Sequence, residues 1–173
     1  MSKSVIAATA RTFDSRLATL EHLLRTGAVH LHEDEIAYLA RRLAPDMLPL
    51  GTQIAFACNQ PLNFALWLDD APGDDLNPIV ETMVTALGHV QDTRALLAGH
   101  LHAPADMPAH KHLVLGDGLC ADLTGEEYVA DFLLPNFYFH VVTAYAILRS
   151  VGVPLGKRDY MLHLLPRVSQ GAA

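Results

Sequence analysis

Residues 124–152 read TGEEYVADFLLPNFYFHVVTAYAILRSVG and carry the clearest structural signals in the chain. Thr124 and Glu127 have the spacing of a capping box, in which each side chain bonds the backbone at the other position. Gly152 suits the position that follows a helix, because glycine tolerates the left-handed conformation found there. The residues between are apolar on most sides, as in a helix buried in a core. These signals predict one long helix from Thr124 to about Val151.

The segment before this helix, HLVLGDGLCADL at 112–123, has a different pattern. Two short alternating runs flank a Gly-Asp-Gly turn, which is typical of a tight β-hairpin. We therefore expect a small hairpin directly before the last long helix.

Three more long helices are predicted earlier in the chain. Their apolar residues recur at steps of three and four, the period of a helix with one buried face. We expect helices over Ser4–Arg25, ended by Gly27, over Asp46–Leu68 and over Asn77–Leu101, with a short helical piece at Glu33–Leu43. Four long apolar-faced helices predict an all-α four-helix bundle.

Length and composition agree with this fold. A chain of 173 residues that is 51% hydrophobic suits a single helical-bundle domain over 1–173. We expect an extended tail from Leu155 that packs on the bundle and frays after about Pro166. The high apolar content, with the last helix apolar nearly all round, also predicts a homodimer.

Charge and cysteine usage exclude several classes of function. A net charge of −7 without a basic cluster argues against binding to nucleic acid or to a membrane surface. Cys58 and Cys120 form no CxxC motif and are interpreted as reduced thiols. The N-terminus lacks a signal-peptide pattern, so we expect a cytoplasmic protein.

One polar stripe stands out on the last helix. Asn136, His140 and Thr143 are spaced four and three apart, so they project from one helical face between apolar neighbours. Burying an amide or an imidazole without a partner costs about 1–3 kcal/mol, so these groups should be hydrogen-bonded. Pro135 leaves the Asp131 carbonyl without its helical donor, and Asn136 could simply satisfy that carbonyl.

A second polar stripe lies on the predicted helix after residue 45. Asp46, Gln53 and Gln60 are seven apart, which keeps them nearly on one side of a helix in a bundle. Two inward stripes on facing helices would create a polar pocket in the bundle core, where such folds place their sites. The predicted pocket residues are Asp46, Gln53, Asn136, His140 and Thr143.

Two blocks of sequence resemble a known family. The chain is similar to an uncharacterised bacterial family, a domain of unknown function, within the DinB/YfiT-like superfamily of candidate metalloenzymes. The resemblance spans most of the chain and rests on RLAPDMLPL at 42–50, NFYFH at 136–140, TAYAILR at 143–149 and GVPLGK at 152–157.

The resemblance implies a metal site. Members of the superfamily hold a divalent metal through one histidine on the second helix and an HxxxH pair on a later helix, and some are thiol-dependent transferases. In this chain the HxxxH pair falls on Asn136 and His140, and the remaining ligand falls near Asp46. One imidazole, one carboxylate and one neutral amide hold zinc poorly compared with three histidines. We therefore expect no tightly bound metal, with loose binding of a divalent metal left open.

Each candidate also has a simpler explanation. Asp46 suits a helix N-cap, and His140 suits a core histidine bonded to Asp46 or Gln53. A bond to a charged Asp46 would raise the pKa of His140. Three functions remain open: a protein with a polar pocket left from a metal site, a metal-dependent hydrolase or thiol-dependent transferase, and a non-catalytic dimer that binds a small molecule.

Two further histidine pairs, at 100/102 and 110/112, have HxH spacing. Residues two apart share a face in a strand but diverge on a helix, so surface histidines explain these pairs better than a zinc site does.

Overall fold

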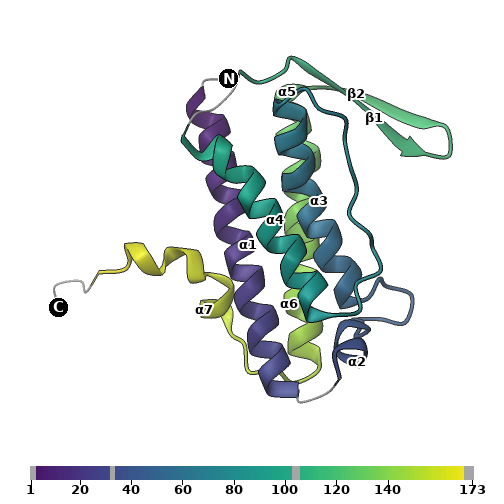
Figure 1. The fold of residues 1–173 in the computed structure, drawn as a ribbon, viewed down its shortest axis with the longest axis vertical. Helices are drawn as coiled ribbons and strands as arrows, with labels where there is room; N and C mark the ends of the chain where they lie inside the picture. Colours follow the sequence, from purple (N-terminus) through teal and green to yellow (C-terminus); the bar gives the residue numbers. More distant parts are fainter. Residues whose placement is uncertain (1–2, 32–33, 103–105, 170–173) are drawn as a thin grey trace.

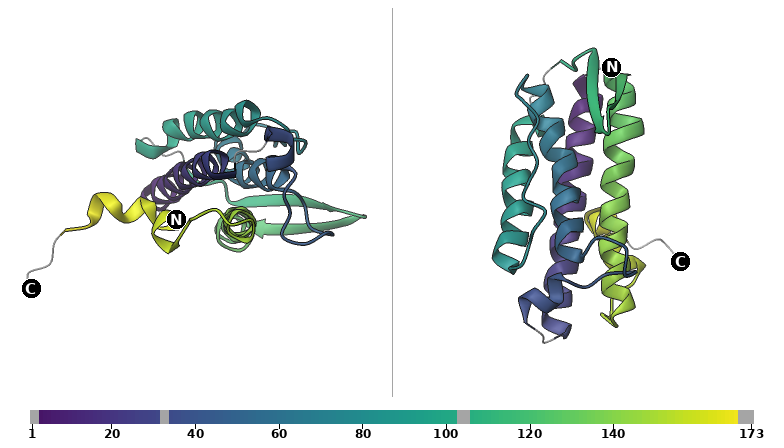
Figure 2. Two further views of the ribbon diagram at one scale, coloured as in Figure 1. Left: turned by 90° about the horizontal axis from the view of Figure 1, so that it is seen from below. Right: turned by 90° about the vertical axis from the view of Figure 1, so that its right-hand side faces the viewer.

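The computed structural model describes residues 3–31, 34–102 and 106–169. The chain is mostly helical and carries one small antiparallel hairpin. The four longest helices, which lie side by side (Figures 1 and 2), are α1 (Lys3–Leu31), α3 (Leu50–Leu68), α4 (Met83–His102) and α6 (Leu134–Ser150). The shorter elements are α2 (Glu35–Leu39), β1 (His110–Gly116), β2 (Leu119–Thr124), α5 (Gly125–Glu127), a π-helical turn (Tyr128–Leu133), α7 (Lys157–Tyr160) and a C-terminal 3-10 helix (Leu162–Arg167).

One hydrophobic core joins the long helices. α3 packs against α4 and α6, and α1 packs against the same two helices. The ring of Phe13 on α1 meets the rings of Phe64 on α3 and Phe137 on α6, with centroids 5.5 and 5.0 Å apart. The predicted apolar stripe of α1 is fully buried at Ile6, Phe13, Leu17, Leu20 and Leu24.

The end predicted for the first helix is wrong, because α1 continues through Gly27 to Leu31. Gly27 is needed for a close approach instead. A Cβ there would lie 2.7 Å from the hydroxyl of Tyr38 and 2.9 Å from a methyl group of Leu148. The Tyr38 hydroxyl donates to the Leu24 carbonyl at 2.8 Å, so the glycine makes room for a buried hydrogen bond.

The start predicted for the next long helix is also wrong. α3 begins at Leu50, and Asp46 lies in an exposed turn before it. Pro49 explains the difference, since it disfavours helical backbone at the preceding residue, Leu48. Pro49 itself is extended and becomes the residue that caps α3.

α4 begins at Met83, later than the predicted start at Asn77. The Asn77 side chain instead accepts a hydrogen bond from the backbone of Ile79, a local turn that competes with helix formation. The Thr82 hydroxyl then accepts from the backbone of Thr85, as a helix-capping side chain does.

The predicted hairpin and the signals of the last helix are confirmed. Asp117 at the centre of the turn has a φ of 49°, between two glycines that also have positive φ. Both bonds of the capping box between Thr124 and Glu127 are present. The helix then passes through the π-helical turn into α6, and Gly152 follows its end with a φ of 91°.

The C-terminal segment packs on the long helices as predicted, but it is partly helical rather than extended. Arg149 donates to the Leu155 carbonyl, and the rings of Tyr145 and Tyr160 meet edge-on. The 3-10 helix continues past Pro166 to Arg167, and residues 170–173 lie outside the described part. No helix within the described ranges is long and apolar enough to cross a membrane.

Candidate functional site

Gln53 and His140 form a buried polar pair between α3 and α6. The His140 ring nitrogen Nδ1 lies 2.7 Å from the Gln53 side-chain oxygen Oε1. Both residues are buried, with 9% of His140 and 2% of Gln53 exposed. The rings of Phe56 and Phe139 pack edge-on against the imidazole at 5.4 and 5.2 Å. The expected contact between the two helices is therefore present, with Gln53 as the partner of His140.

The surroundings keep this histidine neutral. Burial lowers the pKa of His140 from 6.5 to about 4, so the ring carries no charge at neutral pH. The Gln53 amide nitrogen donates to the Leu48 carbonyl at 3.2 Å, which directs its oxygen toward the ring. Nδ1 must then carry the proton, and Nε2 keeps a lone pair.

The other predicted pocket residues have local partners. Asn136 donates to the Phe132 carbonyl at 2.8 Å. The simpler explanation named the carbonyl freed by Pro135, that of Asp131, and is wrong about the acceptor, although the bond is local as it supposed. Thr143 donates to the Phe139 carbonyl at 2.7 Å. Gln60, half-buried, donates in the same way to Phe56 on its own helix. Each of these bonds runs four residues back along one helix.

Asp46 departs most from its predicted role. It is exposed and precedes α3, so it does not continue the stripe of Gln53 and Gln60. Of the two partners expected for His140, Asp46 and Gln53, the neutral amide of Gln53 is the one that bonds it. Burial lowers the pKa of His140, and no charged partner is there to raise it.

The three residues expected near a metal ion do not together form a metal site. Asp46 lies outside the core, Asn136 is bonded to its own helix, and Nε2 of His140 is left as a single strong donor. A catalytic zinc usually has three such protein ligands. Within the described ranges, no group of three or more His, Cys, Asp or Glu side chains is placed to hold a metal ion.

One histidine of each HxH motif lies at hydrogen-bond distance from a carboxylate. His100 lies 3.3 Å from a carboxylate oxygen of Asp69, and His112 lies 2.7 Å from one of Asp122. Since each pair joins different elements, the two HxH motifs do not form one site.

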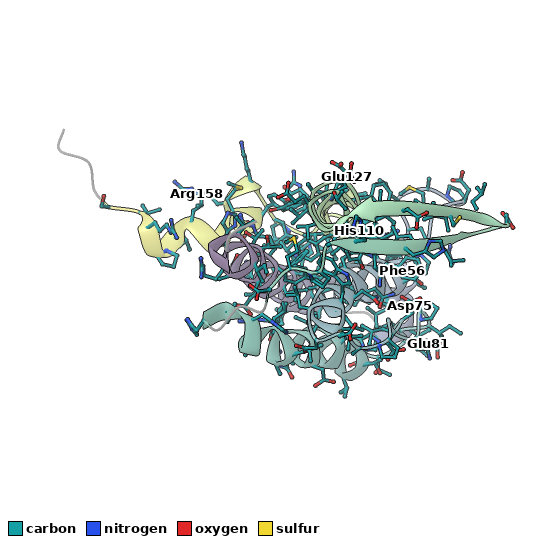
Figure 3. All side chains as sticks on the ribbon, turned by 90° about the horizontal axis from the view of Figure 1, so that it is seen from above. Phe56, Asp75, Glu81, His110, Glu127 and Arg158 are labelled. Carbon is teal, nitrogen blue, oxygen red and sulfur yellow. The ribbon has the colours of Figure 1, made fainter. Side chains whose placement is uncertain are left out.

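An apolar groove of about 430 Å³ lies beside the Gln53–His140 pair. Phe56 joins the two features, because it lines the groove and packs against His140. Phe56 and Glu81 project on the side of the molecule that carries the hairpin (Figure 3). The remaining lining residues are Ile36, Leu39, Ala40, Leu48, Pro49, Thr52, Pro78, Ile79 and Val80.

The sequence pattern did not predict this groove. Its walls come from α2, the turn before α3, α3 itself and the segment before α4, which are brought together only by folding. Ile36, Leu48 and Ile79 remain 60%, 44% and 67% exposed. All three residues fall in segments predicted to be helical, so the pattern of apolar residues did not mark them as the wall of a groove.

Comparisons with known proteins agree with the fold. The chain is similar to a solved DinB family member from Shewanella denitrificans, at 25% identity and a TM-score of 0.74. That similarity covers 92% of this chain and 93% of the other. No curated protein matches. The model of a domain of unknown function, DUF1993, matches residues 6–161. The chain therefore belongs to the DUF1993 family, and its fold is DinB-like.

Proposed function

We propose that this protein binds a small, mainly apolar molecule in the groove beside His140, within a four-helix bundle of the DinB/YfiT type. The observation that carries the proposal is the position of Phe56, which forms part of the groove and packs on the imidazole. The groove volume of about 430 Å³ lies in the range of small-molecule sites, which are mainly apolar with a few polar groups.

Charge narrows the class of ligand. Glu81 supplies the charge at the edge of the groove, and the neutral His140 adds none. A ligand with an apolar body and one positively charged or hydrogen-bond-donating group fits these surroundings.

Binding of benzylamine, compared with uncharged benzyl alcohol, tests the proposal by NMR titration. Ile79→Gln places an amide on the groove wall at a residue that is 67% exposed, so the fold should tolerate it. Val84→Gln makes a comparable change at an exposed residue outside the lining. We expect saturable binding that favours benzylamine, is weakened in Ile79→Gln and is unchanged in Val84→Gln. Equal shifts in all three proteins, or none, would reject the groove as the site.

We further propose that the metal site of the wider superfamily is not kept here. What supports this is the local bonding of Asn136 and the exposed position of Asp46. Elemental analysis of untagged protein should then find no tightly bound transition metal. About one metal ion per chain, lost in His140→Ala, would restore a metal-dependent hydrolase or a thiol-dependent transferase.

The predicted homodimer also remains a proposal. It is supported by apolar side chains on the surface, among them Phe139 and Val142 on α6 and Val114 and Leu119 on the hairpin. Light scattering at tens of micromolar should give the mass of two chains, and a monomer mass would contradict it.

A further inference from the structure

A second cavity lies on the side of α1 away from the groove. It has a volume of about 590 Å³ and opens between the first half of α1, the end of α4 and the C-terminal 3-10 helix. In Figure 1 the yellow C-terminal segment passes α1 at α7 and then projects outward from the long helices. Its lining residues are Ala8, Arg11, Thr12, Asp14, Ser15, Arg16, Leu101, His102, His163, Leu164 and Arg167.

The α1 residues in this list form one helical face. Positions 8, 11, 12, 15 and 16 recur at steps of three and four, like the buried stripe of the same helix. This second face is polar, and a polar helical face usually points to open solvent. Here it is covered in part by the 3-10 helix, whose residues complete the cavity.

Positive charge gathers in this cavity although the protein as a whole carries a net charge of −7. Arg11, Arg16 and Arg167 all line it. Asp14 is the acidic group of the lining, and its carboxylate is bound at 2.7 Å by Arg94, a residue outside the cavity. Within the described ranges no carboxylate lies at ion-pair distance from the three lining arginines, so none of them is held by a direct ion pair.

The guanidinium groups also keep free donors. Arg11 donates to the Leu101 carbonyl at 3.2 Å, and Arg16 donates to the Ser15 hydroxyl at 2.8 Å. A guanidinium has five N–H donors in a planar fork that matches carboxylate and phosphate oxygens. Most donors of this set are therefore available for a ligand.

The pKa of His163 is affected by the positive charge of this cavity. Partial burial, and then the nearby Arg16 guanidinium, lower the pKa of His163. The ring therefore lies close to Arg16, and a negative charge placed between them would relieve the repulsion.

We propose that this cavity binds a small organic anion, with its phosphate or carboxylate group held by Arg11, Arg16 and Arg167 and its apolar part against Ala8, Leu101 and Leu164. The site lies apart from the Gln53–His140 pair and shares no lining residue with the groove. It can therefore be tested independently of the function proposed for that groove.

Calorimetric titration with phenyl phosphate, benzoate and inorganic phosphate tests the proposal on the full chain. The variant Arg11→Gln/Arg16→Gln replaces two guanidinium groups of α1 by neutral amides and so removes two positive charges from the cavity. The matched control, Lys157→Gln/Arg158→Gln, removes the same charge from exposed residues of α7 that do not line the cavity (Arg158 is labelled in Figure 3). Circular dichroism checks that both variants keep their helices.

We expect saturable binding of phenyl phosphate or benzoate that is weakened about tenfold or more in the Arg11→Gln/Arg16→Gln variant and unchanged in the control. Whichever of the two binds identifies the head group. An NMR titration of His163 should show its pKa rising when the bound probe saturates the site. Equal weakening in both variants would mean non-specific attraction, and no saturable binding would remove the site. Inorganic phosphate binding as tightly as phenyl phosphate would contradict the apolar part of the proposal.

Discussion

The neutral, buried His140 makes the stability of the protein depend on pH in a defined direction. Burial lowers its pKa from 6.5 to about 4. As the pH falls, the unfolded chain protonates this imidazole near pH 6.5, whereas the folded protein does so only near pH 4. Proton uptake therefore favours the unfolded state. The stabilisation is complete above pH 6.5 and is lost as the pH falls from about 6.5 to about 4.

The size of the effect follows from the two values. One pKa unit corresponds to about 1.4 kcal/mol, so the complete loss is about 3 kcal/mol. The linkage relation places about 1 kcal/mol of this loss between about pH 7.5 and about pH 5.5. Solvent screening reduces this loss only a little, because His140 is 9% exposed.

Urea denaturation at these two pH values, on wild type and His140→Gln, measures the effect. His140→Gln keeps a polar side chain but has no group that titrates, so wild type should lose about 1 kcal/mol more than the variant. His30→Gln is the matched control, because His30 is exposed on the last turn of α1, and it should keep the wild-type loss. An equal loss in wild type and His140→Gln, or a gain of stability in acid, would refute a neutral buried imidazole.

Three further predictions concern stability and reactivity. Gly51→Ala should cost about 1–3 kcal/mol in urea denaturation, because its Cβ would clash with the backbone oxygen of Val80. Gly88→Ala, where a Cβ meets nothing within 4 Å, should instead stabilise the protein by up to about 1 kcal/mol. If both substitutions changed the free energy of unfolding in the same direction, the packing around these glycines would be contradicted. Burial raises the pKa of the Cys58 thiol to about 12 while Cys120 is exposed, so a thiol reagent should label one cysteine in native protein and two in urea. Rapid labelling of both in native protein would contradict that burial. Thr124→Ala should cost about 1 kcal/mol by removing the capping box, and an unchanged urea midpoint would show that the box does not stabilise the helix.

The sequence predicted elements best where the signal is local. The hairpin turn, the capping box at Thr124 and the glycine at 152 each depend on the conformation of a few neighbouring residues, and all three are present. The predicted helix starts at Asp46 and Asn77 are wrong for a related reason. Both residues can cap a helix, but Pro49 and the turn at Asn77 favour other backbone conformations over the next few residues.

The candidate site was predicted in part. The spacing of Asn136, His140 and Thr143 correctly placed an inward imidazole on the last helix, and the seven-residue step correctly placed Gln53 opposite it. The same step wrongly included Asp46, since a periodic pattern does not show where a helix begins. Whether Asn136 bonds across the core or to its own helix was also not decided by spacing.

The sequence by itself determined the mostly helical class, the buried faces of the long helices and the hairpin, because periodicity and turn chemistry act over a few residues. Tertiary structure alone decided which polar groups meet. His140 is neutral because burial between the helices lowers its pKa, and its hydrogen-bond partner is the amide of a residue 87 positions away. The groove and the arginine-lined cavity are also products of folding, since their walls come from segments that are distant in the chain and close only when the helices pack.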